Sequence, residues 1–311
     1  MLVSSCHGII FLIYFWTKTV PVLRQKGTIM TEEAIKQRIE TGRRFMARWS
    51  QPGDETFESD QQKKLPQPPL VKAPMRETAI ELPKNFDALN LNNDILSVIN
   101  NRKSSRVYTQ EQMSLLELSY LLWTTQGVKE IRGRSYATLR TVPCGGARHE
   151  FECYMLLQNV EGLEDGSYHY LPMEHKIELL YTKAELEERL GMSFRDAISA
   201  TLNGQIWGAK SNVVFYYSMV AYRAEWRYGI RAHRTALIDA GHVTENLYIA
   251  CSAANLGTCA IGAVNTALCD QIFELDGVEE FAFYAATVGM ISESNAQAEK
   301  DFYAFVKRDN L

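Results

Sequence analysis

Apolar residues recur along the chain at two different spacings, and these spacings separate the expected helices from the expected strands. Between residues 235 and 254, Ala236, Ala240, Val243 and Leu247 fall on one helical stripe. A helix that is apolar over most of its circumference is expected to be buried in a core or against another subunit. Short apolar runs rich in β-branched and aromatic residues predict strands at 151–158, 166–171, 175–180, 212–220, 258–264 and 281–290.

Capping residues mark where several helices begin and end. A serine or threonine followed three residues later by glutamate is typical of a helix start, and glycine is typical of a helix end. Together with the strands, these signals predict a compact α+β domain. The predicted helices run from Asp94 through Asn101, from Ser114 to Gly127 and from Thr182 to Gly191.

The first 85 residues follow a different pattern. Residues 31–49 have a partial apolar face and are expected to be helical, whereas residues 50–84 contain six of the nine prolines. Proline fixes φ and lacks an amide donor, so this segment is expected to be an extended connector that crosses a surface. We therefore expect a leader at 1–29, a helical and Pro-rich extension at 30–85 and the principal domain at 86–311.

The leader contains one apolar run, IIFLIYFW, at residues 9–16. A membrane-spanning helix needs about 20 apolar residues. A secretory signal needs a basic start, and residues 1–8 contain no lysine or arginine. Our hypothesis is that residues 1–29 are an upstream translation artefact or a disordered leader, with Met30 as the native start. A weak membrane anchor is the alternative.

Charge and cysteine content argue against a nucleic-acid-binding or zinc-binding protein. The net charge is −4 and no Lys/Arg-rich block occurs, which argues against nucleic-acid binding. The six cysteines form no CxxC pair and no His/Cys cluster with zinc-ligand spacing. We therefore expect buried thiols in a reducing, cytoplasmic protein, no metal site and no membrane partner.

Three segments could carry chemistry. In the extended segment 102–108, Arg102, Ser104 and Arg106 would face one way and could bind a phosphate monoester; a solvated basic turn is the alternative. The loop 142–151 contains paired glycines that permit close approach of a flat ligand. Its Cys144 and His149 could instead be a thiol nucleophile and its base, although no third orienting residue is evident.

The third segment, 255–263, joins the long helix to a strand of small residues. A planar aromatic ring could stack there and accept hydrogen bonds from backbone amides. The commoner explanation for such a segment is a packed turn from helix to strand. It does not have the GxGxxG pattern of a nucleotide-binding crossover.

In this order the three segments resemble the nitroreductase superfamily, and in particular its SagB-type branch. The similarity runs from about Phe86 to Met290, and the 30–85 extension, ending in PQPPL and IELP, is similar to the SagB-type lead-in. The most specific stretches are LSYLLWTTQGV, LRTVPCGGARHEFECY, VEGLEDGSYHYLP with EHKIELL, and DAGHVTENLYIACSAANLGTCAIGAV.

The resemblance implies a nitroreductase-like fold, in which helices flank a central, mostly antiparallel sheet, and a homodimer with FMN at the subunit interface. NADH or NADPH would be the usual electron donor, and the flavin would carry the chemistry. The phosphate would be bound by Arg102, Ser104 and Arg106. The loop along the isoalloxazine ring would contain Pro143, Cys144, Gly145 and Ala147. Backbone amides near flavin N5 would come from Gly262 and Ala263.

Three departures from the family pattern bear on the chemistry. Cys144 stands where serine is usual, and Glu150 stands where proline is usual. Azoline-oxidising relatives carry a Lys-Tyr pair, which Arg227 and Tyr228 replace here. Arginine stays protonated and cannot become a general base, so we expect Arg227 and Tyr228 to act as catalytic residues by orienting or charge-pairing a substrate. A structural Arg-Tyr pair on a surface helix is the alternative.

These observations predict an FMN-dependent oxidoreductase that passes hydride through the flavin to or from a small molecule or a modified peptide. An azoline-to-azole peptide dehydrogenase and a non-catalytic flavin-binding dimer subunit remain open as alternatives. A cysteine-nucleophile enzyme is a further alternative, and it predicts that Cys144→Ser abolishes activity.

Overall fold

The computed structural model describes residues 30–47 and 53–304, which belong to two compact units, Met1–Gln51 and Pro52–Leu311. In the first unit, helix α2 (Glu32–Ala47) has two glutamates in its first turn and Arg44 in its last, an arrangement that complements the helix dipole. The expected leader, 1–29, lies outside the described residues. The expected division at residues 29/30 and 85/86 stays a prediction.

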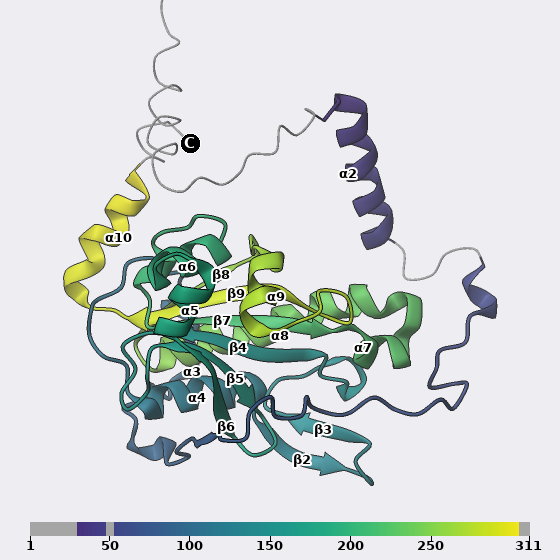
Figure 1. Cartoon of the computed structure of the whole chain (residues 1–311), viewed down its shortest axis with the longest axis horizontal. Helices are drawn as coiled ribbons and strands as arrows, with labels where there is room; N and C mark the ends of the chain where they lie inside the picture. Colours follow the sequence, from purple (N-terminus) through teal and green to yellow (C-terminus); the bar gives the residue numbers. More distant parts are fainter. Residues whose placement is uncertain (1–29, 48–52, 305–311) are drawn as a thin grey trace, which may run out of the picture. The chain divides into compact units, whose positions relative to one another are not determined.

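The second unit is built on a seven-stranded sheet with the order β1-β6-β5-β4-β7-β9-β8 (Figure 1). Each neighbouring pair in this sheet is antiparallel. The strands are β1 (Ile80–Glu81), β4 (Phe151–Leu157), β5 (Gly166–Leu171), β6 (Lys176–Thr182), β7 (Val213–Val220), β8 (Leu256–Ile261) and β9 (Glu280–Met290). A separate hairpin consists of β2 (Val128–Arg132) and β3 (Ala137–Arg140).

Different helices cover the two faces of the sheet, because successive side chains of a strand point to opposite faces. In β4, Cys153 and Met155 enter one apolar cluster, whereas Tyr154 and Leu156 enter the other. Helices α4 (Leu115–Gln126) and α8 (Ala232–Ala253) pack into the first cluster. The second cluster contains residues of α5 (Lys183–Leu190), α6 (Phe194–Thr201) and α9 (Thr266–Phe273). The other α-helices described in this unit are α3 (Ile95–Asn101), α7 (Ala221–Tyr228) and α10 (Ala296–Phe302).

The structure confirms the predicted nitroreductase-like α+β architecture, its antiparallel sheet and its capped helices. Ser114 and Glu117 form a reciprocal capping box at α4. The same arrangement starts α5, which ends at Gly191 with a φ of 65°. The sequence patterns did not reveal α6, α7, α9 or the β2–β3 hairpin. The three helices have eight residues each, which is too few turns for a clear apolar period.

The Pro-rich segment is extended, as predicted, and it crosses the surface of its own domain. Its backbone amides bind buried carboxylates of the sheet: the Lys72 amide donates to Glu152 at 2.8 Å, and the Arg76 amide donates to Glu178 at 2.7 Å. Farther upstream, the Gln61 amide donates to the carbonyl of Trp226 at 2.8 Å. These contacts fix the segment next to the end of α7, where it meets the site described below.

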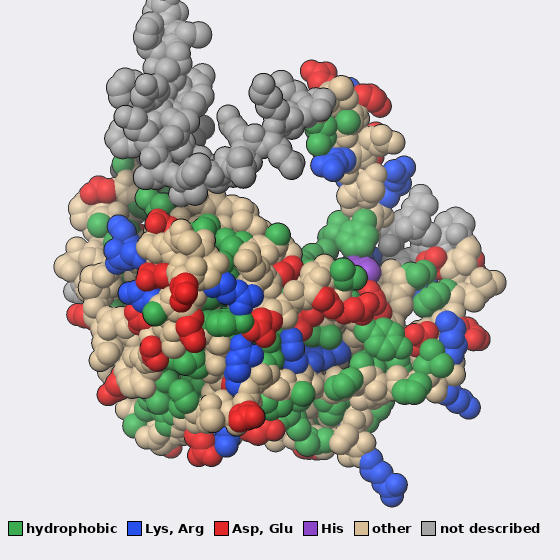
Figure 2. All heavy atoms as spheres, in the orientation of Figure 1, with side chains coloured by type: hydrophobic (Ala, Val, Ile, Leu, Met, Phe, Trp, Pro, Cys, Tyr) green, Lys and Arg blue, Asp and Glu red, His purple; other side chains and the backbone are tan. Residues whose placement is uncertain are grey.

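The charge of the surface and the apolar length of the helices both bear on possible partners. On the face seen in Figure 2, acidic and basic side chains are interspersed rather than gathered by sign. Among the described residues, no helix combines the length and the apolar character that crossing a bilayer requires.

Candidate functional site

The segment that contains Arg102 and Ser104 is extended beside β8. Ser104 forms a parallel bridge with Thr258, and the Ser105 amide donates to the Thr258 carbonyl at 2.8 Å. The Tyr248 hydroxyl lies 2.9 Å from Ser104 Oγ and accepts a hydrogen bond of 2.9 Å from the amide of Ala260, on β8. The Arg102 guanidinium lies over the Tyr248 ring, 5.1 Å from its centroid. Tyr248 therefore connects the segment to both α8 and β8.

Arg106 belongs to the same segment but has different partners. Its guanidinium lies 5.5 Å from the ring centroid of Trp207 and hydrogen-bonds to the hydroxyl of Tyr303. The amides of Arg106 and Val107 both donate to the carboxylate of Glu299, on α10, at 3.1 Å and 3.0 Å. The structure thus groups Arg102 and Ser104 around Tyr248, while the Arg106 side chain is directed toward α10. The backbone here already binds one anionic group.

Gly262 and Ala263 follow directly after β8 and are exposed. A Cβ atom built on Gly262 would meet no heavy atom within 4 Å. Within the described part of the chain, neither amide donates to a carbonyl or a side-chain oxygen. These two donors are therefore free to bind a ligand that approaches the backbone closely.

The loop that contains Pro143, Cys144, Gly145 and Ala147 packs against α7 and α8. The Gly145 amide donates to both carboxylate oxygens of Asp239, at 3.1 Å and 2.9 Å. A Cβ on Gly145 would lie 2.5 Å from Thr235 Cγ2. Pro143 is exposed and Ala147 is half-buried. The glycine is thus explained by packing against α8, which is a different reason from the close ligand approach that the sequence suggested.

Gly146 shows the same relationship to α7. Its φ is 55°, and a Cβ there would lie 2.3 Å from Arg227 Nε and 2.9 Å from the Tyr228 hydroxyl. Arg227 Nη1 also donates to Gln61 Oε1 and to the Tyr136 hydroxyl, both at 3.0 Å. The structure therefore brings Arg227 and Tyr228 to the 143–147 loop, together with a residue of the Pro-rich segment.

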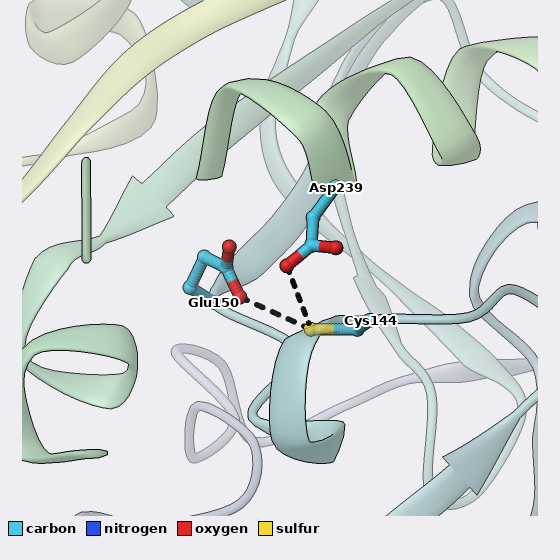
Figure 3. Close-up of side chains that lie close together, drawn as sticks. All are labelled: Cys144, Glu150 and Asp239. Atoms are coloured by element: carbon cyan, nitrogen blue, oxygen red, sulfur yellow. Dashed lines mark hydrogen bonds between the residues drawn. The ribbon is translucent and has the colours of Figure 1, made fainter. Parts of the chain in front are cut away.

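Three ionisable side chains meet where this loop packs against α8 (Figure 3). Cys144 belongs to the loop, Glu150 follows it, and Asp239 projects from α8. Cys144 Sγ lies 3.2 Å from Glu150 Oε2 and 3.4 Å from Asp239 Oδ2. Glu150 is 1% exposed and Asp239 is 3% exposed. Their three potential ligand atoms lie within 4.8 Å of one another. This spacing alone does not identify a metal site, because a thiol and two carboxyl groups that share a proton have similar spacings.

Burial controls the protonation of these groups. Burial raises the pKa of the Cys144 thiol well above its usual range, and the neighbouring Glu150 and Asp239 carboxylates raise it further. Burial and the negative charge of Asp239 raise the pKa of Glu150 to about 7. Burial lowers the pKa of His149 to about 2, so its ring is neutral at ordinary pH. The His149 group that contacts the thiol is its backbone amide, which donates to Cys144 Sγ at 3.0 Å. A thiol held protonated, with no imidazole base hydrogen-bonded to it among the described residues, is not an activated nucleophile, which argues against the cysteine-nucleophile alternative.

Four of the predicted site residues thus form two groups along α8. The first group, Arg102 and Ser104, meets the helix at Tyr248, and the second, Cys144 and Gly145, meets it at Asp239. The two anchor positions are nine residues apart (248 − 239), which corresponds to about 13 Å along a helix axis.

Comparison with known proteins identifies the family of the chain. The model of the nitroreductase family matches residues 99–290, which include both groups. The chain belongs to the nitroreductase family. A protein of Methanocaldococcus jannaschii that is named as a nitroreductase is 30% identical over 192 residues, which cover 62% of this chain and 88% of the relative. Family members are oxidoreductases, and this chain is one of them by descent.

Two further relatives bear on fold and branch. A nitroreductase-type crystal structure from Ralstonia eutropha superposes with a TM-score of 0.52 at 22% identity, covering 74% of this chain and 95% of the other. The trifolitoxin-processing protein TfxB of Rhizobium leguminosarum bv. trifolii is 25% identical over 179 residues, which cover 56% of this chain and 46% of TfxB. Similarity to a peptide-processing protein agrees with the SagB-type resemblance.

Sequence reasoning did not assign several residues that the structure places at these groups. Tyr248 lies within the predicted long helix, where nothing in the sequence pattern distinguished it from a packing residue. Asp239 lies on the same helix beside Ala236, Ala240 and Val243, and a lone acidic residue on a buried stripe was the available signal. The contributions of Gln61 and Tyr136 had no such signal, because they depend on tertiary contacts between distant segments.

Proposed function

We propose that this nitroreductase-family protein binds FMN and transfers hydride between a nicotinamide and a small molecule or modified peptide. The observation that carries the proposal is the double contact of Tyr248. Its hydroxyl contacts Ser104 in the proposed phosphate segment and the amide of Ala260, two residues before Gly262. One side chain thus holds the proposed phosphate donors in place relative to the strand that leads to the open amides.

The donors in this region suit a phosphorylated, electron-accepting ring. Arg102 offers a permanently charged guanidinium, and Ser104 offers a hydroxyl on the same segment. The open amides of Gly262 and Ala263 could donate hydrogen bonds to a ring without introducing a titrating group. When bound, FMN would supply the hydride chemistry, and these residues would bind and orient it.

A homodimer would complete such a site. Helix α8 and α3 leave apolar side chains exposed, including Ile238 at 53%, Ile95 at 61% and Leu96 at 65%. Exposed apolar side chains such as these are buried when another protein surface covers them. We propose that the 143–147 loop of one subunit approaches the flavin bound by Arg102 and Ser104 of the partner subunit, with Arg227 and Tyr228 orienting the substrate.

The second candidate function is oxidation of a heterocycle in a peptide. The similarity to TfxB, a trifolitoxin-processing protein, favours a peptide as the substrate class. The contacts of Arg227 disfavour a base at this position, since its guanidinium is held by Gln61 and Tyr136 and cannot lose its proton at ordinary pH. Turnover of an azoline-containing peptide to the azole would establish this candidate.

The test of the main proposal is cofactor loading of the purified full-length protein. We expect a yellow protein that releases FMN on denaturation and whose flavin is bleached by NADH or NADPH without oxygen. A flavin that binds but is not bleached by either nicotinamide would support the non-catalytic dimer instead. A protein that stays colourless and does not bind added FMN would exclude both.

A further inference from the structure

We propose that Glu150 and Asp239 hold one proton between them, and that this proton-holding pair supplies the proton that accompanies hydride transfer to a substrate. The inference rests on the proposed function, because the hydride must come from a bound flavin. It concerns a position where Glu150 replaces the proline that the family resemblance leads one to expect, so the pair is a property of this chain.

The carboxyl groups of Glu150 and Asp239 both lie next to the thiol of Cys144. Glu150 follows the 143–147 loop and Asp239 projects from α8, and both carboxyl groups are directed at Cys144 Sγ (Figure 3). Glu150 and Asp239 are almost completely buried, at 1% and 3% exposure. Two carboxylates this close in a buried position repel each other strongly, so one of the pair is expected to keep its proton.

The two carboxyl groups differ in their hydrogen-bond partners. Asp239 accepts the Gly145 amide at both of its oxygens, which stabilises its negative charge. Glu150 is less well supported: its Oε2 accepts the weakly donating Cys144 thiol, and its Oε1 is buried and has no hydrogen-bond partner among the described residues. An unpartnered oxygen is much less costly on a neutral carboxyl group than on a carboxylate. The proton is therefore expected to reside mainly on Glu150.

Several charged or titratable side chains surround the carboxyl groups of Glu150 and Asp239. Burial and the negative charge of Asp239 raise the pKa of Glu150 and so disfavour a second negative charge, whereas the hydrogen bond from the Cys144 thiol lowers this pKa by a smaller amount. His242 Nδ1 lies 3.5 Å from Asp239 Oδ1, and a positive charge on the His242 ring would stabilise the Asp239 carboxylate. Other charged or titratable groups around the loop and the cluster are Arg140 from β3, Arg148 and His149 from the loop, and Arg223, Arg227 and Tyr228 from α7. Arg223 pairs with the buried Glu152 at 2.5 Å, and none of these arginines is among the strongest influences on Glu150. A proton, rather than a cation, is therefore expected to neutralise Glu150.

Cys144 gives the buried pair a route to the ligand side of the loop. It is the half-buried member of the cluster, and its thiol hydrogen-bonds to Glu150. A thiol can donate one hydrogen bond and accept another, so it can pass a proton between a bound substrate and the pair. The hydroxyl of serine, the residue that the family resemblance leads one to expect, can make the same two kinds of hydrogen bond.

The reaction balances for reduction of a nitro group. The nitro compound takes a hydride from the reduced flavin and one proton from the pair, an N–O bond breaks, and the products are a nitroso compound and water. The pair is left with one additional negative charge. It regains its proton from solvent when the product leaves, so no further oxidant or reductant is needed.

The test uses Glu150→Gln, which keeps the size of the side chain and removes the exchangeable proton. Glu161→Gln is the matched control, because Glu161 is exposed and makes the same change of charge beyond the opposite end of β4 from Glu150. Asp239→Asn is the second variant, in case Glu150→Gln does not fold. Each full-length protein is titrated by infrared spectroscopy without substrate, and then assayed with FMN and NADH.

The infrared experiment tests the proton directly. We expect wild type and Glu161→Gln to show the absorption of a buried carboxylic acid that disappears near neutral pH, and Glu150→Gln to lack it. Absence of this absorption in wild type, or its persistence in both Glu150→Gln and Asp239→Asn, would overturn the proposal. So would a stoichiometric metal ion in the purified protein whose removal by a chelator disrupts the cluster, because a cation would then replace the proton.

The assay tests the use of the proton. Ferricyanide takes electrons without protons, whereas a nitroaromatic acceptor needs both. General acids typically contribute about 100-fold or more to rate, so we expect the ratio of nitroaromatic to ferricyanide rate to fall at least about tenfold in Glu150→Gln. An unchanged ratio and pH profile with intact FMN binding would refute the inference while leaving the proposed function in place. Failure of the wild-type protein to bind FMN would refute the proposed function, and the infrared result would still decide the protonation of the pair.

Discussion

The hydroxyl of Tyr248 lies 2.9 Å from Ser104 Oγ, although the two residues are 144 positions apart in the sequence. The same hydroxyl accepts the amide of Ala260. This contact is the point at which the long helix, the proposed phosphate segment and the strand before the open amides meet. The contact joins segments that lie far apart in the sequence, and the first prediction concerns the loss of this hydroxyl.

Tyr248→Phe should weaken FMN binding without unfolding the protein. The substitution keeps the ring beneath Arg102 and removes the hydroxyl, which leaves Ser104 and the Ala260 amide without this partner. Loss of one such hydrogen bond is worth about 1 kcal/mol, or roughly a fivefold rise in Kd. Quenching of flavin fluorescence gives the Kd. Tyr168→Phe is the control, because it removes a hydroxyl that binds the Glu164 carbonyl on the β5 side of the domain; an equal effect in both variants would contradict the prediction.

Arg102→Ala should reduce affinity for FMN more than affinity for riboflavin. The two ligands share the ring system and differ in the phosphate, so a guanidinium that binds the phosphate contributes to FMN alone. Loss of a charge-assisted hydrogen bond is worth about 1.5–3 kcal/mol, which predicts roughly a 10- to 150-fold weaker FMN complex. Isothermal titration with both ligands measures the difference. An equal loss for FMN and riboflavin would show that Arg102 does not bind the phosphate.

Cys144→Ser should retain most of the activity. Burial and two neighbouring carboxyl groups keep the thiol protonated, so it has no role as a nucleophile, and serine preserves a donor at the same position. We expect kcat/KM to change by less than about tenfold, because a hydroxyl still donates to Glu150. Cys144→Ala, which has no donor, should be slower than Cys144→Ser. Complete inactivity of both variants would restore the cysteine-nucleophile interpretation.

Glu150 should make the protein less stable as pH rises from about 4.5 toward neutrality. Its pKa is raised from 4.5 to about 7 in the folded protein, so below pH 4.5 both the folded and the unfolded states carry the proton. Between pH 4.5 and about 7 only the folded state keeps it, and the free energy of unfolding falls as pH rises. The total loss is on the order of 3 kcal/mol.

Urea unfolding at several pH values tests this dependence. Glu150→Gln cannot ionise, so its stability should change less across this window than that of wild type or of Glu161→Gln. Parallel pH profiles for wild type and Glu150→Gln would show that Glu150 does not titrate in this range.

Lys72→Met should destabilise the docking of the Pro-rich segment. Lys72 Nζ lies 2.6 Å from Glu280 Oε2, and the two side chains are only 24% and 12% exposed. Removing the cation leaves a partly buried carboxylate without its charge partner, which is expected to cost about 1–3 kcal/mol. Lys63→Met is the control: its pair with Asp60 is 48% and 30% exposed and should contribute less than about 1 kcal/mol. Equal melting temperatures for the two variants would contradict the prediction.

Several features of the fold could be predicted from local sequence because they depend on neighbours within a few positions. The capping boxes at Ser114 and Thr182 need only a hydroxyl and a glutamate three residues apart. The apolar runs at 151–158 and 212–220 identified buried strands, because a sheet covered by helices on both faces has apolar side chains in both directions. The family motifs in 102–106, 143–147 and 262–263 likewise are short and contiguous.

Tertiary structure decided which of these segments meet and what surrounds them. Glu150 was recognisable as an unusual residue, but its partner Asp239 is 89 positions away (239 − 150), and only the packing of the loop against α8 brings the two carboxyl groups to one thiol. Likewise, Gln61 reaches Arg227 because the Pro-rich segment crosses the end of α7. Burial, and therefore protonation, depends on everything packed around a group, whereas spacing along the chain reports only its nearest neighbours.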